Sequence, residues 1–444
     1  MKHHLHFASR RNILSLLSLL LTLVLISCQQ ETKSGAGEEA VSVADSLAGN
    51  SMPAQEPDYT PAQRDSVLRV RAQALAQTFI IVDGHVDLPY RLQNKKADIS
   101  KRTEGGDFDW ERAREGGLDA PFMSIYIPAA YEERGGGREL ADRLISMVEQ
   151  IASENPDKFA LANSPEDVRR NFEKGLISLP MGMENGTPVG GKLENLDYFY
   201  KKGIRYITLA HSKSNHISDS SYDPEKRWGG LSPFGREVVR RMNSLGIMVD
   251  VSHISDSAFY QVLQITKAPV VATHSSARHF TPGFERNMSD EMIKALARNK
   301  GVMMVNFGSA FISDESRKLW DSAKTVADRW AQEQGLSAQD DRVSKYREQY
   351  FHEQGGRTNV QAVADHIDHV VKLVGIEHVG LGSDFDGVGD TLPEGLTDVS
   401  DYPNLIYELL KRGYSEDDIR KIASDNIFRV WREVEKAAGN TAVQ

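Results

Sequence analysis

Short apolar runs recur along the chain with stretches of helical spacing between them, and this feature constrains the fold more than any other. Most of the runs are continuous and rich in β-branched residues, which is typical of parallel strands buried on both faces. The segments between them, such as 235–245 and 290–299, have helical spacing. The predicted strands are Phe79–Val86, Ala120–Tyr126, Leu176–Gly182, Ile204–Leu209, Ile247–Val251, Val270–Thr273, Val302–Asn306 and Val379–Ser383.

Eight such β–α units predict an α/β fold, a (β/α)8 TIM barrel, in a domain that spans residues 63–440. The chain of 444 residues is 40% hydrophobic, which is enough apolar material for one large domain. A doubly wound open sheet is the alternative arrangement of the same units. The longest insertion, Asp314–Arg357, lies between the seventh and eighth predicted strands and is predicted to be helical. We expect it to act as a cap or as an oligomer contact, for example in a homodimer.

The first residues of the chain have the pattern of an export signal. Basic residues precede an almost entirely apolar run at 13–26, which is too short for a comfortable membrane span and fits the core of a signal peptide. The run ends in Leu-Ile-Ser-Cys at 25–28, which resembles the lipobox of bacterial lipoproteins. Residues 1–27 are therefore predicted to be a lipoprotein signal peptide and Cys28 the lipidated residue. The protein would be exported to the bacterial cell envelope and anchored to a membrane; a plain secretory signal is the alternative.

A second segment, 28–62, is rich in Gly, Ser, Ala, Glu and Pro and has no hydrophobic periodicity. It cannot bury enough apolar surface to offset its chain entropy, so we expect a flexible tether. An amphipathic helix near Arg64–Gln77 then begins the globular part. The net charge of -10, with no basic concentration, excludes nucleic acid as a partner. The single cysteine excludes a disulfide within the chain.

Polar side chains of the metal-binding kind stand at the ends of the predicted strands. His85 and Asp87 end the first strand and, being two residues apart, point to the same face. This pair alone would be weak evidence, because such pairs are often structural. Similar residues end five further strands, at the end of a barrel where its chemistry takes place. They are Glu184, His211, His253, His274 and Asp384.

This set of ligand types predicts zinc. Imidazoles together with carboxylates suit zinc better than magnesium or calcium, which prefer oxygen ligands. Two histidines, a third histidine paired with an aspartate, and a glutamate make five ligands, more than the three that one catalytic zinc usually takes from the protein. The set fits two zinc ions that share a carboxylate and hold a water between them, which lowers the pKa of that water and polarises a carbonyl.

The strings VDGHVDLPYRL, GMENG, YITLAHSKSN, DVSH, PVVATHSSAR, RNMSD and GLGSDFDGV resemble those of the membrane (renal) dipeptidase family of the amidohydrolase superfamily. The resemblance runs in order from Phe79 to about Trp431. It implies a metallo-dipeptidase with two zinc ions per chain and dipeptides as substrates. The implied metal ligands are His85 and Asp87 for the first zinc, His253 and His274 for the second, and Glu184 as the bridge.

The resemblance also assigns three residues to the substrate. His211 matches a histidine that contacts the substrate and stabilises the tetrahedral intermediate. Arg286 matches the arginine that binds the terminal carboxylate of the substrate. Asp384 matches the acid/base residue that moves a proton from water to the leaving amine. Spacing departs most from the family between 278 and 285, so Arg278 is a rival for the carboxylate role.

The sequence also offers a second candidate metal pair and two alternative functions. His366 and His369 stand three apart on a predicted helix, a spacing that can bind metal, but acidic neighbours at 365 and 368 favour a solvated polar face. Another activity on the same barrel, such as hydrolysis of N-acyl amino acids or β-lactams, is the enzymatic alternative to dipeptide cleavage. A peptide-binding lipoprotein without catalysis is the non-enzymatic alternative.

Overall fold

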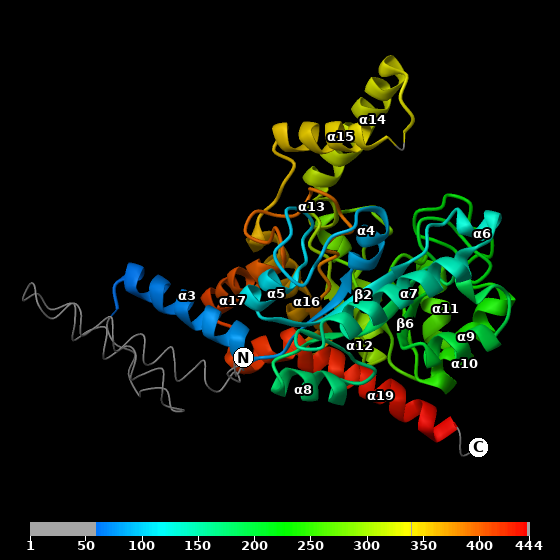
Figure 1. Ribbon diagram of the computed structural model, residues 1–444, viewed down its shortest axis with the longest axis horizontal. Helices are drawn as coiled ribbons and strands as arrows, with labels where there is room; N and C mark the ends of the chain where they lie inside the picture. Colours follow the sequence, from blue (N-terminus) through cyan, green and yellow to red (C-terminus); the bar gives the residue numbers. More distant parts are fainter. Residues whose placement is uncertain (1–58, 339, 442–444) are drawn as a thin grey trace, which may run out of the picture.

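A computed structural model describes residues 59–338 and 340–441 (Figure 1). The predicted signal peptide, Cys28 and nearly all of the predicted tether lie outside the described residues. Helix α3 (Pro61–Thr78) begins the described chain, three residues before the predicted start at Arg64. Thr60 accepts from the backbone N–H of Gln63, whose side chain accepts from the N–H of Thr60, so a capping box fixes this start.

Helix α3 differs from the amphipathic helix that the sequence predicted. Its buried side chains are confined to the last two turns, at Ala72, Leu75 and Ala76. There it packs against α17 (Tyr402–Lys411), while its first turns extend beyond the barrel (Figure 1). Among the described residues, no helix is long and apolar enough to cross a membrane.

Eight parallel strands form a closed barrel, in the order β1-β10-β9-β8-β7-β6-β5-β2. Closure is made by β1 pairing with β10, where Asp83 lies opposite Leu381. The TIM barrel is thus confirmed and the open sheet excluded. The barrel strands are β1 Ile81–Val86, β2 Leu118–Tyr126, β5 Met181–Glu184, β6 Ile204–Thr208, β7 Met248–Asp250, β8 Val271–Ala272, β9 Val302–Val305 and β10 Val379–Leu381.

One predicted strand is wrong as a single element. The run Leu176–Gly182 divides into β4 (Ile177–Leu179), which pairs with β3 (Phe159–Leu161) outside the barrel, and β5, which joins it. Pro180 separates the two and has no N–H to offer a continuing ladder, while its carbonyl accepts from the N–H of Met123 on β2. An apolar run does not reveal that its two halves belong to different sheets.

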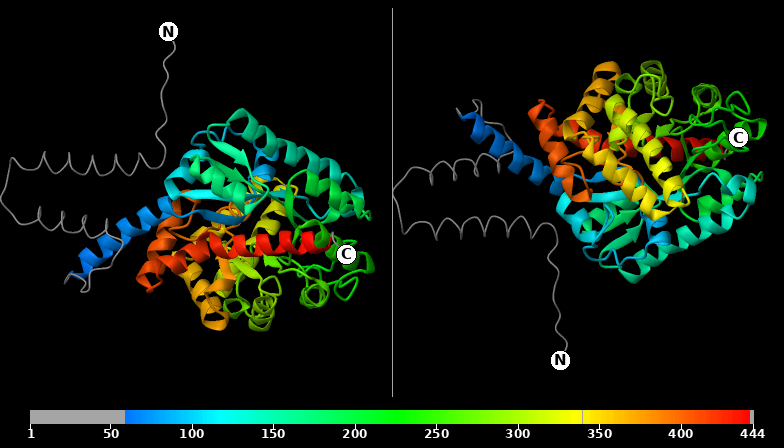
Figure 2. Two further views of the ribbon diagram at one scale, coloured as in Figure 1. Left: turned by 90° about the horizontal axis from the view of Figure 1, so that it is seen from below. Right: turned by 90° about the horizontal axis from the view of Figure 1, so that it is seen from above.

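Helices surround the barrel, as seen from two sides in Figure 2. Several begin at a Ser or Asn N-cap whose side chain accepts a backbone N–H of the first turn, including Ser232, Ser255, Ser289 and Asn359. The helices after α3 are α4 Leu88–Asn94, α5 Trp110–Gly116, α6 Tyr131–Arg134, α7 Gly137–Glu154, α8 Pro165–Glu173, α9 Glu194–Lys201, α10 Pro233–Leu245, α11 Asp256–Ile265, α12 Asp290–Arg298, α13 Ser309–Ile312, α14 Asp314–Gln334, α15 Asp341–Glu353, α16 Val360–Val374, α17, α18 Glu416–Arg420 and α19 Asn426–Thr441.

The barrel interior is filled by inward-facing side chains and closed at one end by α19. Trp431 of α19 is fully buried and its ring centroid lies 5.2 Å from that of Phe122, which in turn lies 5.4 Å from Tyr206. These rings belong to a core that also includes Val82, Met248 and other strand residues. Because α19 covers this end (Figure 1), the polar strand ends are left at the other.

The insertion between β9 and β10 is helical, as predicted. Helices α14 and α15 pack on each other through a small core of Ala327, Ala331 and Val343, where the ring of Trp330 stacks on that of Tyr346 at 4.6 Å. They form an arm that stands away from the barrel, at the end opposite α19 (Figure 1). Its predicted role as a cap or an oligomer contact stays a prediction.

Candidate metal centre

The polar strand ends converge on the side chain of Glu184, at the end of β5. Its Oε2 lies 3.5 Å from His85 Nε2, on the side of β1. Its Oε1 lies 3.1 Å from His253 Nε2 and 3.2 Å from His274 Nε2, after β7 and β8. Glu184 is 3% exposed. One carboxylate therefore presents its two oxygens to two separate groups of ligand atoms.

Each of these groups has the composition of a metal site. On one side, His85 Nε2 lies 3.6 Å from Asp87 Oδ2 and 4.0 Å from Asp384 Oδ1. On the other, the Nε2 atoms of His253 and His274 face each other at 2.7 Å. His85 Nε2 and Asp87 Oδ1 are buried and have no hydrogen-bond partner. Buried, unpartnered ligand atoms aimed at one another fit divalent cations better than a hydrogen-bond network.

A layer of hydrogen bonds behind the ligands fixes their rings. His85 Nδ1 lies 2.8 Å from the Tyr206 hydroxyl, and His274 Nδ1 lies 2.8 Å from Thr273 Oγ1. Thr273 donates its hydroxyl to Asp250 at 2.8 Å. Such contacts on the far nitrogen of an imidazole orient the ring and select its tautomer, leaving Nε2 for the metal.

Sequence reasoning missed the two aspartates that organise this layer. Asp83 accepts from the N–H of His85 at 2.9 Å and of Ser383 at 3.0 Å, and it also accepts from the hydroxyl of Tyr402. Asp250 accepts from the N–H of Ser252 and Thr273, each at 3.0 Å. Both are fully buried. Their signal in the sequence is an aspartate within an apolar strand, two or three residues before a ligand.

Several site residues have left-handed backbone. Positive φ values occur at His253 (68°), Asp384 (65°) and Asn185 (77°), a conformation that non-glycine residues adopt rarely and that gathers at functional sites. At Asn185, side-chain hydrogen bonds offset the energy cost of this backbone conformation. Its amide N–H donates to the Ile127 carbonyl and its amide oxygen accepts from the Asn215 amide, each at 2.9 Å. Its amide is therefore committed to the loops rather than to the pocket.

Asp384 lies after β10 with one oxygen held and one facing the ligands. Its Oδ2 accepts from the Asn306 amide at 2.8 Å, and its Oδ1 faces His85. Burial raises the pKa of Asp384 to about 6 and that of Glu184 to about 7, the charge of His85 opposing the rise in both. A carboxyl whose pKa lies near neutrality can both accept and return a proton.

A reciprocal pair of aspartates supports the loop that follows Asp384. Asp386 accepts from the N–H of Asp107 at 2.6 Å, and Asp107 accepts from the N–H of Asp386 at 2.7 Å. Arg91 Nε lies 3.3 Å from Asp386 Oδ2. Burial raises the pKa of Asp107 to about 7 and that of Asp386 to about 6. Between the pair and the site lies Gly387, where a Cβ would come 2.2 Å from Asp87 Oδ2 and 2.5 Å from Asp384 Oδ1.

His211, after β6, stands at the edge of the cluster. Its Nε2 lies 3.6 Å from Glu184 Oε1 and its ring packs edge-on against Tyr126 with centroids 4.9 Å apart. Its side chain keeps 19% of its surface exposed, against 7% or less for the other three histidines of the cluster. Burial lowers its pKa to about 3, and the charge of Arg286 adds to this. A neutral imidazole at the open edge can contact a substrate.

Arg286 places its guanidinium beside His253. It donates to Ser275 Oγ and to the carbonyl of His274, both at 2.8 Å, and its Nη2 lies 3.0 Å from His253 Nε2. Its Nε is buried without a hydrogen-bond partner. The side chain is thus fixed on the segment that follows β8, while donors remain for an anion at the cluster.

Arg278, the rival for that role, is used elsewhere. It donates to both carboxylate oxygens of Asp256 at 2.6 and 2.7 Å and to the carbonyls of Asn287 and Glu285. These bonds bind α11 to the loop that carries Arg286. Arg278 therefore fits a structural role in this loop, and the structure brings Arg286 rather than Arg278 to the cluster.

Aromatic side chains line the approach to Arg286. The ring centroid of Tyr222 lies 6.0 Å from that of His253 and 5.9 Å from that of Phe284, and the guanidinium of Arg286 lies 5.5 Å from the Phe311 centroid. Tyr222 keeps 40% of its surface exposed. Sequence reasoning missed these rings, because Tyr222 and Phe284 lie in loops and Phe311 in the short helix α13, and none of them belongs to a motif.

The prediction for His366 and His369 is wrong for the first of them. His366 is fully buried, where its Nδ1 accepts from the N–H of Ala277 at 3.0 Å and its Nε2 lies 3.0 Å from the Ile312 carbonyl. Burial lowers its pKa to about 3. The acidic residues 365 and 368 instead form a separate stripe that pairs with Arg412. His369 is half-buried and pairs with Asp290 at 2.8 Å.

Comparisons with known proteins agree on one group. The family model of the membrane dipeptidases, peptidase family M19, matches residues 69–444. A dipeptidase of Aspergillus oryzae is 34% identical over 376 residues, which cover 82% of this chain and 80% of that protein. The crystal structure of a probable dipeptidase from Pseudomonas aeruginosa superposes with a TM-score of 0.73 at 27% identity, covering 85% of this chain and 100% of that one. A dipeptidase described as a metallopeptidase of family M19 superposes with a TM-score of 0.66 at 26% identity, covering 80% and 99%.

Proposed function

The chain belongs to the membrane dipeptidase family, peptidase family M19, and is a metallo-dipeptidase that hydrolyses peptide bonds; from this premise we propose that it cleaves dipeptides with two zinc ions. The observation that carries the proposal is the position of Glu184. Its two oxygens face two ligand groups, His85 with Asp87 and His253 with His274. Nitrogen and carboxylate ligands in these numbers suit zinc.

Bound there, two zinc ions would lower the pKa of a water held between them and polarise the carbonyl of the scissile bond. The side chains do the remaining work. Asp384 accepts a proton from the attacking water at Oδ1, while Asn306 holds Oδ2 at 2.8 Å. It then delivers that proton to the leaving amine. His211, neutral at the edge of the cluster, donates to the oxygen on which negative charge develops.

The restriction to dipeptides comes from Arg286. Its guanidinium lies 3.0 Å from His253 Nε2, so a carboxylate that it binds must lie close to the scissile bond. A substrate with only one residue beyond that bond presents its C-terminal carboxylate at this position. Longer peptides would place a neutral peptide group there, which leaves a buried cation unpaired.

We further propose that the protein is exported and lipid-anchored to the bacterial cell envelope. The support is in the sequence, where the only cysteine, Cys28, follows the apolar run in a lipobox-like string. Cys28→Ala should abolish incorporation of labelled palmitate and release the protein from membranes. Retention of C28A in the membrane fraction would contradict the anchor.

A substrate panel combined with metal counting tests the function. Dipeptides, tripeptides, N-acyl amino acids and a β-lactam would be offered to the protein while its bound zinc is measured. We expect cleavage of dipeptides, and about two zinc ions per chain in the buried cluster around Glu184. Cleavage of acylated amino acids or β-lactams alone would indicate another activity on this barrel. Peptide binding without turnover at full zinc loading would indicate a binding protein.

A further inference from the structure

A second group of metal-binding side chains lies outside the barrel. We propose that His279, Asp290 and His369 form a separate transition-metal site of the zinc type. The three residues come from three elements: the 3-10 turn Arg278–Phe280, the first turn of α12 and the third turn of α16. None of them belongs to the cluster around Glu184.

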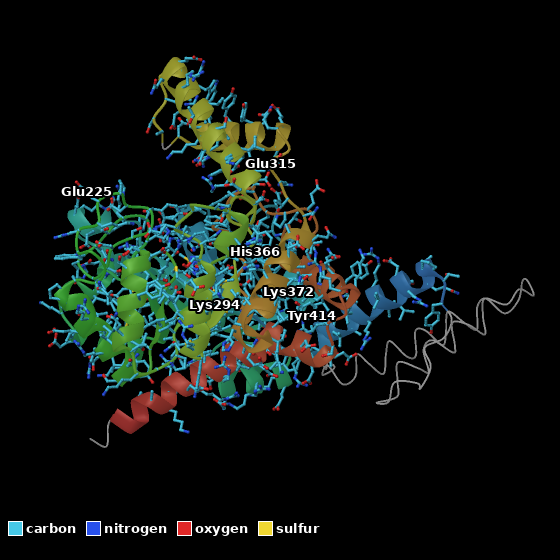
Figure 3. All side chains as sticks on the ribbon, turned by 180° about the vertical axis from the view of Figure 1, so that it is seen from behind. Glu225, Lys294, Glu315, His366, Lys372 and Tyr414 are labelled. Atoms are coloured by element: carbon cyan, nitrogen blue, oxygen red, sulfur yellow. The ribbon has the colours of Figure 1, made fainter. Side chains whose placement is uncertain are left out.

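The geometry brings one ligand atom of each side chain to within 4.8 Å of the other two. His369 Nε2 lies 2.8 Å from Asp290 Oδ1. The rings of His279 and His369 stack with centroids 4.4 Å apart and planes inclined by 18°. Figure 3 shows where this occurs: Lys294 on α12 and His366 and Lys372 on α16 are labelled on helices that lie side by side.

The chemistry of the donors selects the metal class. Two imidazoles and one carboxylate make a mixed nitrogen and oxygen set, which binds zinc and its neighbours among the transition metals rather than magnesium or calcium. His279 is exposed, so water can complete the coordination. The site is therefore open to ions from solution, unlike the buried cluster.

The surroundings hold the donors in place without competing for them. Phe280 packs edge-on against His279, with centroids 4.9 Å apart, and against His369 at 5.6 Å. The two nearby lysines are paired with other carboxylates, Lys294 with Glu291 at 2.8 Å and Lys372 with Asp368 at 3.9 Å. The carboxylate of Asp290 is thus left to His369 and to a metal.

A metal here would fasten the loop that carries Arg286. The loop is closed at its base, where Arg278 donates its N–H to the Met288 carbonyl at 2.8 Å and Met288 donates to Ser276 at 2.9 Å. His279 lies inside this closed loop. Coordination by His279 and His369 together would join the loop to α16. This consequence rests on the proposed function of Arg286, whereas the metal site itself does not.

Counting zinc in matched variants tests the site. Wild-type protein, His279→Gln, Asp290→Asn and His352→Asn would be dialysed against micromolar free zinc and their bound zinc measured. His352 is the control, because its Nε2 lies 3.6 Å from an oxygen of Asp390. Among the described residues, His352 belongs to no group of three possible metal ligands. We expect H279Q and D290N each to bind about one zinc ion fewer than wild type and H352N to match it.

Equal zinc content in wild type and H279Q would overturn the proposal, as would an extra ion that binds only at millimolar zinc. The difference between variants does not depend on how many ions the buried cluster holds. Failure of the proposed function can therefore be distinguished from failure of this second site. A second measurement is amide hydrogen exchange of residues 278–288 with and without added zinc. Zinc should slow exchange in wild type and not in H279Q. No change in wild type would contradict the fastening of the loop.

Discussion

Replacing Arg286 by lysine should weaken recognition of the substrate carboxylate while leaving the charge in place. Arg286 donates one hydrogen bond to Ser275 Oγ and one to the carbonyl of His274, both at 2.8 Å, and its Nε has no hydrogen-bond partner. A lysine ammonium is a point charge that cannot fulfil these structural bonds and a two-pronged bond to a carboxylate together. We therefore expect R286K to lose one charge-assisted hydrogen bond to the substrate.

The loss can be estimated from the energy of such a bond. A hydrogen bond to a charged group contributes about 1.5–3 kcal/mol, and about 1.4 kcal/mol corresponds to a factor of ten. For a dipeptide with a free carboxylate, kcat/KM should thus fall by roughly 10- to 150-fold. For the same dipeptide with a C-terminal amide, wild type should already be slow, and R286K should change kcat/KM little.

The assay measures release of the N-terminal residue from the free dipeptide and from its C-terminal amide. The quantity compared between variants is the ratio of the two kcat/KM values. Arg278→Lys is the matched control, because Arg278 bonds to Asp256 at 2.6 and 2.7 Å and to loop carbonyls. The ratio should collapse in R286K and persist in R278K. A wild-type ratio in R286K would refute the assignment, and a collapse in R278K instead would transfer the role to Arg278.

Three further predictions concern the carboxylates. Asp384→Asn should keep its zinc, counted by mass spectrometry, while kcat falls by about 10²–10⁴-fold because proton transfer is lost; unchanged turnover would mean that another residue is the base. Gly387→Ala should lower activity strongly, since its Cβ would lie 2.2 Å from an oxygen of Asp87, whereas Gly439→Ala, with nothing within 4 Å, should not. The pKa of Asp107 is raised to about 7 in the folded protein, so protonation of this carboxyl stabilises the folded state. The stabilisation is fully present below the unfolded pKa near 4 and is lost as the pH rises through about 7. Asp107→Asn should therefore flatten the decline in stability between pH 4 and 7, by at most about 4 kcal/mol, in denaturant titrations of zinc-loaded protein; parallel curves for D107N and wild type would contradict this.

The strands and the ligands could be predicted because both depend on local pattern. A buried parallel strand must be apolar throughout, so a polar residue such as His85 or His274 stands out at the end of the run. The barrel then brings the strand ends together, whatever lies between them. Glu184 was found in this way although the predicted strand Leu176–Gly182 missed the division at Pro180. Its position at the end of the run did not depend on where the strand began.

The rest could not be predicted because it depends on which helix faces which. His366 has acidic neighbours at 365 and 368, yet it points inward to Ala277 and Ile312. Only the packing of α16 against α12 and the loop after β8 decides this. Asp83 and Asp250 resemble ordinary strand residues until the hydrogen bonds across the barrel are known. The aromatic side chains of Tyr222 and Phe284 lie in loops, where periodicity carries no information.

The seam between β1 and β10 has a consequence for how the protein reaches its active form. There Ser383 donates to Asp83 across 300 positions of the chain, and Asp384 donates to the carbonyl of His85 at 3.1 Å. Contacts of such sequence separation form slowly, because the chain loses the entropy of closing a long loop before the contact stabilises it. During synthesis, a chain that ends before β10 carries every proposed zinc ligand but has an open sheet and no proton-transfer residue. Turnover therefore reports that the last strand has docked, which would allow refolding to be followed by activity alone.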